Sequence, residues 1–354
     1  MAYFRKLTSK MDELLKVLNK EQRWLILINA DPDALASAMA LKRILSRRVE
    51  AVGIAQVNTI TRPDNLAMMN LLRIPSQKLT PLLAAQYDHF ALVDSQPHHH
   101  PDFAAFKFSI VIDHHPVSKE HPVQADFVEL CPGYGANSTI MTEYLYGFGI
   151  RPGKLLATAL LYGIKTDTHS FELKFDNIDI NAFRYLTKFY SPAMLHKILR
   201  SEFKKEWLQY LAVAFKKIRR MRHGMIVSMG AVDSPDILVV LADLLLRVEG
   251  ANWAMVCGLS EEKLVVVFRG DGLRKDMGKF ATSLFGDMGS AGGHKTMARA
   301  EIPLSLLEGQ RAQNFVWDRL HRHKKRNQKQ KTGLPKDIPP DTVPDTTPVS
   351  APKN

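Results

Sequence analysis

The chain has 354 residues, two cysteines, a formal net charge of +12 and an ordinary apolar content of 45%. The length predicts two domains, and the basic excess indicates a polyanionic partner such as nucleic acid or a nucleotide, with a merely basic surface as the alternative. No apolar run approaches the ~20 residues that span a bilayer, which excludes a membrane-spanning protein. Because Cys131 and Cys257 match no metal-binding or redox spacing and no signal-peptide pattern is present, we expect a reducing, cytoplasmic setting.

The N-terminal part of the chain alternates strand and helix signals after an amphipathic helix predicted over 3–22. Strands are expected at 24–28, 52–54, 90–93, 108–112 and 125–130. Helices are expected at 34–48, 65–72, 138–147 and 153–164. This alternation predicts a doubly wound parallel sheet with right-handed crossovers.

Four apolar segments in this region each run into a carboxylate. The carboxylates are Asp31 with Asp33, Asp94, Asp113 and Asp167. In a doubly wound sheet such ends meet at one crevice, where like charges repel strongly. Divalent cations held by carboxylate and imidazole ligands resolve that repulsion, so the sequence predicts a metal site.

The alternative is that these residues are helix N-caps and turn residues, where Asp is favoured in any case. That explanation fits each of the four segments alone but fits all four together poorly, because His114 and His115 accompany them. Three further histidines, His98 to His100, are predicted to lie in an exposed loop, since adjacent loop residues rarely converge on one ion.

The C-terminal part of the chain reads as a second α/β unit. Helices are predicted to fill 177–222, and the last of them is a basic connector. Strands at 225–229, 253–258 and 264–268 surround an apolar helix at 235–247, and a helix over 277–284 leads into a glycine-rich loop. Arg269 at a strand end, with Gly292, Gly293 and His294 in the loop, indicates an anion site.

Domain boundaries follow from these segments. We predict an N-terminal domain over 1–200, a helical basic connector over 201–222, a second domain over 223–322 and a disordered tail over 323–354. The basic start of that tail favours a role in holding nucleic acid or in solubility.

The carboxylate-bearing segment ends and Asp113-His114-His115 resemble the DHH phosphoesterase superfamily, and Arg269 with Gly292-Gly293-His294 is similar to its DHH-associated C-terminal domain. The resemblance covers about residues 20 to 305. It implies an active site in the cleft between a parallel-sheet domain and a smaller α/β domain. Members of this superfamily include nanoRNases that also act as 3′-phosphoadenosine-5′-phosphate (pAp) phosphatases, single-strand exonucleases and cyclic-dinucleotide phosphodiesterases. Type II inorganic pyrophosphatases carry a different C-terminal domain.

The resemblance also implies roles for individual residues. Asp31 would hold one Mn²⁺ ion, Asp33, His114 and Asp167 the other, and Asp94 would bridge the two, with Mg²⁺ or Co²⁺ as alternative ions. Asp113 would orient His114, and His115 would contact the scissile phosphate. The residues that would clamp the far end of the substrate are Arg269, Gly292, Gly293 and His294.

The sequence departs from the family pattern at Leu27, where many members carry a histidine ligand. Asn29 stands where the exonuclease branch uses an acid, so Asn29 is the remaining candidate ligand and the first ion is expected to be held less tightly. In the C-terminal loop Ala291 replaces a glycine and Arg299 a small residue.

Three functions remain open at this point. The first is two-metal hydrolysis of short single-stranded RNA or a small phosphorylated nucleotide, by a monomer or a homodimer without membrane attachment. The second is a catalytically weakened nucleotide-binding regulatory module. The third is a nucleic-acid scaffold that acts through the basic connector and tail. The sequence leaves open the substrate among these nucleotides, the polarity of RNA degradation, the oligomeric state and the role of the tail.

Overall fold

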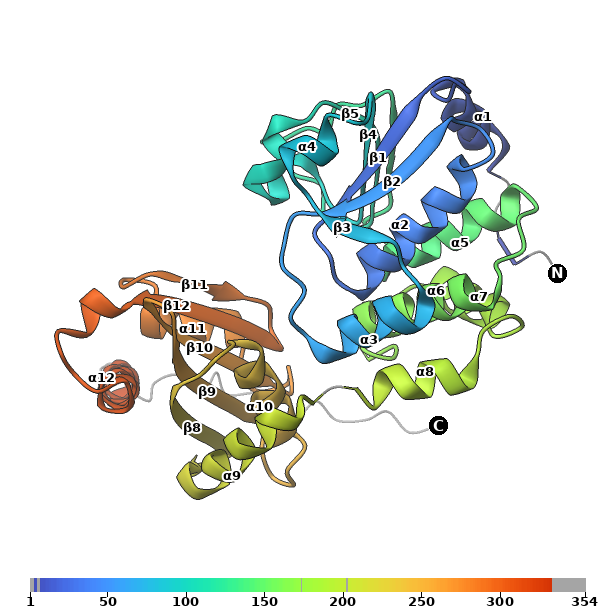
Figure 1. Ribbon diagram of the computed structural model, residues 1–354. Helices are drawn as coiled ribbons and strands as arrows, with labels where there is room; N and C mark the ends of the chain where they lie inside the picture. The colour runs from blue at the N-terminus through green and yellow to red at the C-terminus, as the bar shows by residue number, and fades with distance from the viewer. Residues whose placement is uncertain (1–2, 5–6, 173, 202, 333–354) are drawn as a thin grey trace, which may run out of the picture. The chain divides into compact units, whose positions relative to one another are not determined.

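The computed structural model describes residues 3–4, 7–172, 174–201 and 203–332, with side chains described as far as His323. The chain divides into two compact units, Met1–Leu208 and Gln209–Asn354. Both units are α/β (Figure 1), and the predicted fold class of a parallel-sheet domain followed by a second α/β domain is confirmed.

The N-terminal unit is built on a six-stranded sheet in which every pairing is parallel, with the strand order β3-β2-β1-β4-β5-β6. Its strands are β1 (Arg23–Ile28), β2 (Ala51–Gln56), β3 (Ser76–Lys78), β4 (His89–Val93), β5 (Phe108–Asp113) and β6 (Phe127–Leu130). The order reverses between β1 and β4, so the crevice of this sheet lies at the carboxyl ends of β1, β4 and β5.

The strands are apolar on both sides because both faces of the sheet are covered. Trp24, Ile26 and Ile28 of β1 face one core cluster, while Leu25 and Leu27 face the other. This alternation follows from the two-residue period of a strand.

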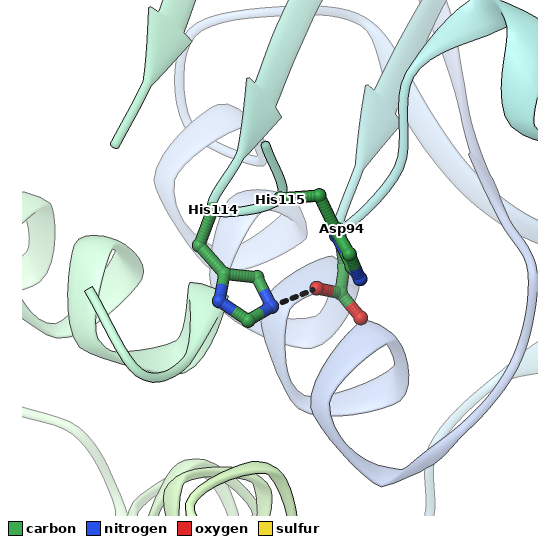
Figure 2. A group of neighbouring side chains, drawn as sticks. All are labelled: Asp94, His114 and His115. Carbon is green, nitrogen blue, oxygen red and sulfur yellow. Dashed lines mark ion pairs between the residues drawn. The ribbon is translucent and has the colours of Figure 1, made fainter. Parts of the chain in front are cut away.

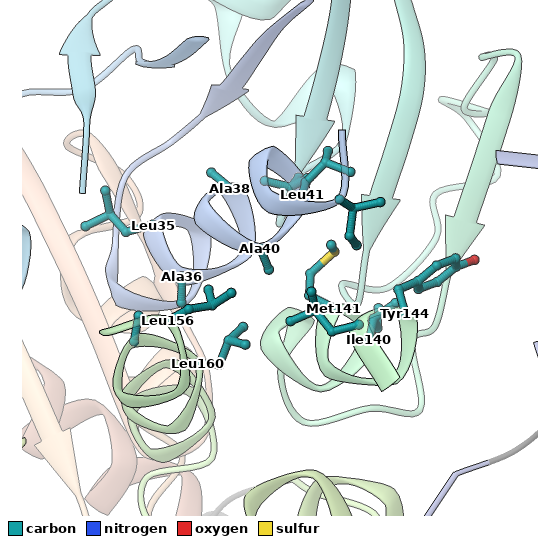
Figure 3. Close-up of a cluster of buried hydrophobic side chains, with 14 of the residues drawn as sticks. Leu35, Ala36, Ala38, Ala40, Leu41, Ile140, Met141, Tyr144, Leu156 and Leu160 are labelled. Carbon is teal, nitrogen blue, oxygen red and sulfur yellow. The ribbon is translucent and has the colours of Figure 1, made fainter. Parts of the chain in front are cut away.

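Helices α2, α5 and α6 pack together beside the sheet (Figure 1). Small residues of α2, among them Ala36 and Ala40, allow the close approach of Leu156, Leu160 and Met141 that Figure 3 shows. The helices of this unit are α1 (Thr8–Lys16), α2 (Pro32–Leu45), α3 (Pro63–Leu72), α4 (Pro81–Ala84), α5 (Asn137–Gly147), α6 (Lys154–Asp167), α7 (Asn177–Leu186) and α8 (Pro192–Leu199), with short 3₁₀ turns at Pro97–His99, Pro101–Ala105 and Lys205–Trp207.

The C-terminal unit contains a mixed sheet with the order β11-β12-β10-β9-β8-β7. Its strands are β7 (Arg219–Met221), β8 (Gly224–Ala231), β9 (Trp253–Ser260), β10 (Lys263–Gly270), β11 (Ser290–Gly293) and β12 (Met297–Pro303). Among the described strands of this second sheet, only β8 and β9 pair in parallel, because α10 crosses between them.

Four helices and one 3₁₀ turn complete the described part of this unit. They are α9 (Leu208–Lys217), α10 (Asp236–Leu246), α11 (Met277–Phe285), α12 (Ala312–Thr332) and the turn Leu304–Leu307. None of the helices in the described ranges combines the length and apolar character needed to cross a membrane.

Three segments differ from the sequence-based expectation. The predicted helix ending at Arg222 gives way to β7, which pairs with β8 as an edge strand, a place where charged side chains are favoured. The predicted glycine-rich loop contains β11, which pairs with β12. Helix α12 continues to Thr332, so the first part of the predicted tail is helical; the rest of the tail, 333–354, lies outside the described residues.

Candidate metal centre

The loop after β1 places two carboxylates at the start of α2. Asp31 is the N-cap of this helix and accepts a hydrogen bond from the N–H of Ala34 (2.9 Å), while Pro32 occupies the first helical position. Asp33, one residue into the helix, is fully buried. Local capping chemistry therefore fixes the spacing and direction of both acids.

The Asp33 carboxylate is held by the start of a second helix. Its two oxygens accept hydrogen bonds from the backbone N–H groups of Asn137 (2.6 Å) and Ser138 (2.8 Å), at the beginning of α5. These N–H groups have no partner within their own helix and carry the positive end of its dipole, so they stabilise a carboxylate. Asp33 thus joins α2 to α5 at the edge of the crevice.

Asp94 follows β4 in a left-handed backbone conformation, with φ of 59°. Asp tolerates this region better than most side chains, and the Asp94 N–H donates to the carbonyl of Ile112 in β5 (2.9 Å). The turn directs the buried carboxylate toward β5 instead of continuing the strand.

His114 follows β5, and its two ring nitrogens have different partners. Nδ1 lies 3.2 Å from the carbonyl oxygen of Tyr134; a carbonyl can only accept, so Nδ1 carries the proton. Nε2 lies 3.3 Å from Oδ1 of Asp94 and 3.3 Å from Oδ2 of Asp167, and it would offer its lone pair to a cation bound between them. A backbone carbonyl that fixes the tautomer in this way is a usual partner of a metal-binding histidine.

Asp33, Asp94, His114 and Asp167 form one group whose potential ligand atoms all lie within 4.8 Å of one another. Oδ1 of Asp94 and Nε2 of His114 are buried and have no hydrogen-bond partner. Buried polar atoms without partners are rare and costly, and carboxylate oxygen with imidazole nitrogen is a donor set that suits divalent cations such as Mn²⁺ and Zn²⁺. The residues present therefore fit a bound divalent cation.

Crowding of these acids shifts their ionisation. Burial and the neighbouring Asp167 raise the pKa of Asp33 to about 7. Burial and Asp33 raise the pKa of Asp94 well above its usual range, and burial raises the pKa of Asp167 as well. Burial alone would lower the pKa of His114, but its contacts with Asp167 and Asp94 outweigh burial and raise it to about 12. Without cations the protein holds protons in this group.

Asp113 differs from its expected role. It is fully buried and accepts hydrogen bonds from Nε2 of Gln96 (2.8 Å) and from Nδ1 of His115 (2.8 Å), so it orients His115 and not His114. The reason is the two-residue period of extended chain, which puts Asp113 and His115 on one side and His114 on the other. Figure 2 shows His114 directed at Asp94, with His115 beside them.

Other predicted ligands lie farther from this group. Asp31 has a solvent-exposed surface but is close enough to raise the pKa values of Asp94 and Asp167. Desolvation by the surrounding protein and the Asp33 charge raise its own pKa to about 6. Asn29 is exposed beyond β1, and its role in metal binding stays a prediction. Leu27 is fully buried in the core on the other face of the sheet, so it cannot contribute a ligand.

The 3₁₀ turn after β4 places one of its histidines beside the centre. His98 and His99 are exposed, yet His99 forms a potential metal-binding group with Asp113 and His115. Nδ1 of His99 accepts a hydrogen bond from the N–H of Gln96 (3.2 Å). The expectation of a merely exposed loop therefore missed the position of His99.

Sequence reasoning also missed two supports of the centre. Gln96 is fully buried and ties Asp113 to the segment after β4. Gly163 lies where α6 passes Asp33: a Cβ atom there would meet Oγ of Ser138 at 2.4 Å and Oδ1 of Asp33 at 2.8 Å. An isolated glycine in an apolar helix was the available signal for this close approach.

Asp167 lies at the end of helix α6, so it reaches the centre from a helix, as the helix predicted over 153–164 implied. Packing of α6 against α2 delivers it beside Asp33. An apolar run alone does not distinguish a buried helix from a buried strand.

The predicted substrate residues lie on neighbouring strands of the C-terminal sheet. Arg269 near the end of β10 pairs with Met297 of β12, and Gly293 of β11 pairs with Ala298 of β12. Gly293 has φ of 146°, and a Cβ there would overlap the carbonyl of Met297.

Arg269, Gly292 and His294 differ in the contacts that they make with the rest of the protein. Nε of Arg269 is bonded to Asp243 (2.6 Å). His294 is exposed, and a Cβ at Gly292 would meet open space. Their contact with substrate stays a prediction.

Residues 24–164 match the family model described as "DHH family, N-terminal domain". The uncharacterized protein MJ1633 of Methanocaldococcus jannaschii is 32% identical over 282 residues, which are 79% of this chain and 58% of that protein. The cyclic-di-AMP phosphodiesterase PdeA of Listeria monocytogenes is 26% identical over 204 residues, covering 54% of this chain and 29% of PdeA. The chain thus spans little more than half of the first of these relatives and less than a third of the second.

The crystal structure of an exopolyphosphatase-related protein from Bacteroides fragilis has a similar fold. Its TM-score is 0.71 at 13% identity, over 92% of this chain and 98% of that chain. The family match supports the resemblance for residues 24–164, which correspond to a DHH family N-terminal domain, and the structural similarity extends to the fold of the whole chain.

Proposed function

We propose that this protein is a divalent-cation-dependent phosphoesterase that hydrolyses short single-stranded oligoribonucleotides or small phosphorylated nucleotides such as pAp. One observation carries the proposal. Asp33, Asp94, His114 and Asp167 converge within 4.8 Å, and two of their buried ligand atoms, Oδ1 of Asp94 and Nε2 of His114, make ion-pair contacts at 3.3 Å but no hydrogen bond. A protein that needed no cation there would avoid burying three acids together.

Asp33, Asp94, His114 and Asp167 would hold one ion, and Asp94 would share a second ion with Asp31 and Asn29. Mn²⁺ suits this mixed oxygen and nitrogen set, with Mg²⁺ and Co²⁺ as alternatives. Divalent cations bound there would lower the pKa of a coordinated water and neutralise charge on a phosphate.

The protein's own groups orient the reaction. Asp113 accepts a hydrogen bond from Nδ1–H of His115 (2.8 Å), so Nε2 of His115 can donate to a phosphate oxygen in the doubly protonated form of the ring. The His115 side chain is 42% exposed while Asp113 is fully buried, so the pair offers a fixed donor at the mouth of the centre. A donor that is already oriented stabilises developing charge on phosphate oxygens without reorganisation.

Several findings support a nucleotide or RNA substrate without selecting one. The chain is strongly basic, and a relative is described as a cyclic-di-AMP phosphodiesterase. As a separate point on location, the two described cysteines are free, which suits a reducing cytoplasm. Arg269, Gly292, Gly293 and His294 would bind the far phosphate or base of the substrate.

The Asp94→Asn variant tests this proposal with a short RNA and Mn²⁺. Loss of the shared ligand should lower kcat/KM by more than about 100-fold, because outer-shell partners of metal ligands alone account for 10–100-fold. Asp102→Asn, an exposed carboxylate on the 3₁₀ turn, is the matched control and should keep full activity. Unchanged turnover by Asp94→Asn, or by wild type in excess chelator, would refute the proposal.

A second candidate, a nucleotide-binding module with little catalysis, is favoured by one observation. Leu27 occupies the position of a usual histidine ligand and is buried in the core. Turnover separates the two candidates: tight binding of Mn²⁺ and pAp with no hydrolysis of any nucleotide would favour the module.

A further inference from the structure

The basic connector seen in the sequence forms part of a pocket in the C-terminal unit. A cavity of about 220 Å³ lies between the end of α9, the strands β7 and β8, and α12. The groups that matter for binding are three cations, two neutral polar side chains and one indole. These side chains are Lys216, Lys217, Arg219, Ser228, Gln313 and Trp317, which we call the basic pocket.

The positive charge of the basic pocket is not neutralised by the described part of the protein. Lys216, Lys217 and Arg219 are exposed, no acidic side chain lines the cavity, and no described carboxylate forms an ion pair with them. Other cations of this unit are paired, among them Lys263 with Glu301 at 2.8 Å and Arg319 with Asp287 at 2.8 Å. The basic pocket therefore retains charge for an external anion.

The dipole of helix α9 offsets only a small part of this positive charge. Lys216 and Lys217 lie in the last turn of α9, where basic residues offset the negative end of the helix dipole. That end is equivalent to roughly half an elementary charge, whereas the basic pocket carries three cations. Charge also continues outward along the chain, because Arg220 and Arg222 are exposed as well.

Trp317 fixes the direction of one of the cations. The guanidinium carbon of Arg219 lies 5.3 Å from the centre of the Trp317 ring. A guanidinium group stacked on an indole face keeps its N–H edge free, and that edge matches two phosphate oxygens. Ser228 and Gln313 supply neutral polar groups beside it.

The sheet order separates this pocket from the predicted substrate residues. β7 forms one edge of the C-terminal sheet and β11, with Gly292 and Gly293, forms the other. Within this unit the basic pocket thus lies at the opposite sheet edge from the predicted substrate residues on β11.

We propose that the basic pocket, extended by Arg220 and Arg222, binds the sugar-phosphate backbone of single-stranded nucleic acid. The elongated run of cations suits a chain of phosphates better than one small anion. The inference rests on the proposed function, whose substrate class it narrows toward oligonucleotides with several phosphates.

Binding of fluorescein-labelled oligouridylates of 3 and 12 nucleotides to the full chain tests this inference. Anisotropy is measured in chelator, so that no turnover occurs, at a series of salt concentrations. The logarithm of the binding constant falls with the logarithm of the salt concentration, and each lost phosphate contact makes this slope shallower by about 0.7. The double variant Lys217→Ala/Arg219→Ala should therefore lose about 1.4 of this slope and bind the 12-mer on the order of 10-fold more weakly.

The control is Lys16→Ala/Lys20→Ala, which removes two exposed lysines from the N-terminal unit and should bind like wild type. Equal affinity and slope in the Lys217→Ala/Arg219→Ala variant would overturn the inference, as would an equal loss in the control. Loss of binding to phosphatidylserine vesicles with unchanged oligonucleotide binding would overturn it too, by assigning the pocket to membranes.

A turnover measurement separates this inference from the proposed function. With Mn²⁺, the Lys217→Ala/Arg219→Ala variant should hydrolyse a dinucleotide at the wild-type rate, whereas Asp94→Asn should not hydrolyse it. If Asp94→Asn remains active, the phosphoesterase proposal fails while the binding result still stands.

Discussion

The N-terminal unit gathers Asp31, Asp33, Asp94 and Asp167 around His114, whereas the C-terminal unit holds one half-buried cation, Lys275, between two aromatic rings. Nζ of Lys275 lies 4.4 Å from the centre of the Trp253 ring and 3.7 Å from that of Phe280. Electron-rich ring faces satisfy an ammonium group.

The acids of the N-terminal unit are compensated less completely. Asp33, Asp94 and Asp167 share one imidazole, and two buried ligand atoms of the group make no hydrogen bond. The comparison teaches that a buried charge indicates a ligand only where the surrounding protein leaves it unsatisfied. Each prediction below tests one side of this contrast.

The largest expected effect is stabilisation by metal. A cation at 100 times its dissociation constant should raise the free energy of unfolding by about 2.7 kcal/mol, which corresponds to a rise of roughly 5–10 °C in Tm for a unit of this size. His114→Ala should lose most of this rise, since Nε2 of His114 is a central ligand atom. Thermal melts with and without Mn²⁺ measure it.

His98→Ala is the matched control, because His98 is an exposed imidazole outside the group. An equal Mn²⁺-induced shift in wild type and His114→Ala would contradict the assignment of His114 as a ligand.

The next effect concerns Gly163. In Gly163→Ala, the new methyl group would overlap Ser138 and Asp33, and such overpacking typically costs about 1–3 kcal/mol. Because the collision displaces the Asp33 carboxylate, affinity for Mn²⁺ should fall as well. Calorimetric titration with Mn²⁺ and chemical denaturation measure the two effects.

Gly153→Ala provides a comparison on the same helix. A Cβ at Gly153 meets nothing within 4 Å, so Mn²⁺ affinity should not change. Wild-type affinity in Gly163→Ala would show that the close approach of α6 does not hold Asp33 in place.

The smallest expected effect is the pH response of Lys275. Burial, with a contribution from Arg222, lowers the pKa of Lys275 from 10.5 to about 8 in the folded protein, although the ring contacts oppose part of this shift by favouring the charged form. Between about pH 8 and 10.5 the unfolded chain binds more protons, so this group makes stability rise with pH. Lys275→Met should flatten that rise. Urea denaturation at several pH values measures the free energy of unfolding of both proteins. The same pH dependence of this free energy in both would show that the rings keep Lys275 charged.

The sequence predicted five strands of the N-terminal sheet because they contain apolar runs, and it missed the edge strand β3 because Ser76–Lys78 is polar. Asp33, Asp94 and His114 could be placed at one crevice because parallel strand ends must share an edge. The pairing of Asp113 with His115 was not predicted, since motif spacing says nothing about which hydrogen bonds form.

Other differences arise from tertiary context. Arg219 to Met221 have helical neighbours, yet pairing with β8 makes them an edge strand. The position of His99 beside His115 depends on a 3₁₀ turn in which the backbone N–H of Gln96 donates to His99, while the buried Gln96 side chain donates to Asp113. Local patterns carry no information about such contacts.

The pairing of β1 with β4 in the sheet has a consequence for when the metal centre can form during folding. Trp24 lies opposite His89 although β2, α3, β3 and α4 separate them along the chain. Contacts between distant segments form late because closing a long loop costs entropy. During synthesis the first acids therefore emerge long before Asp94, His114 and Asp167, and the ion can enter only after most of the domain has folded.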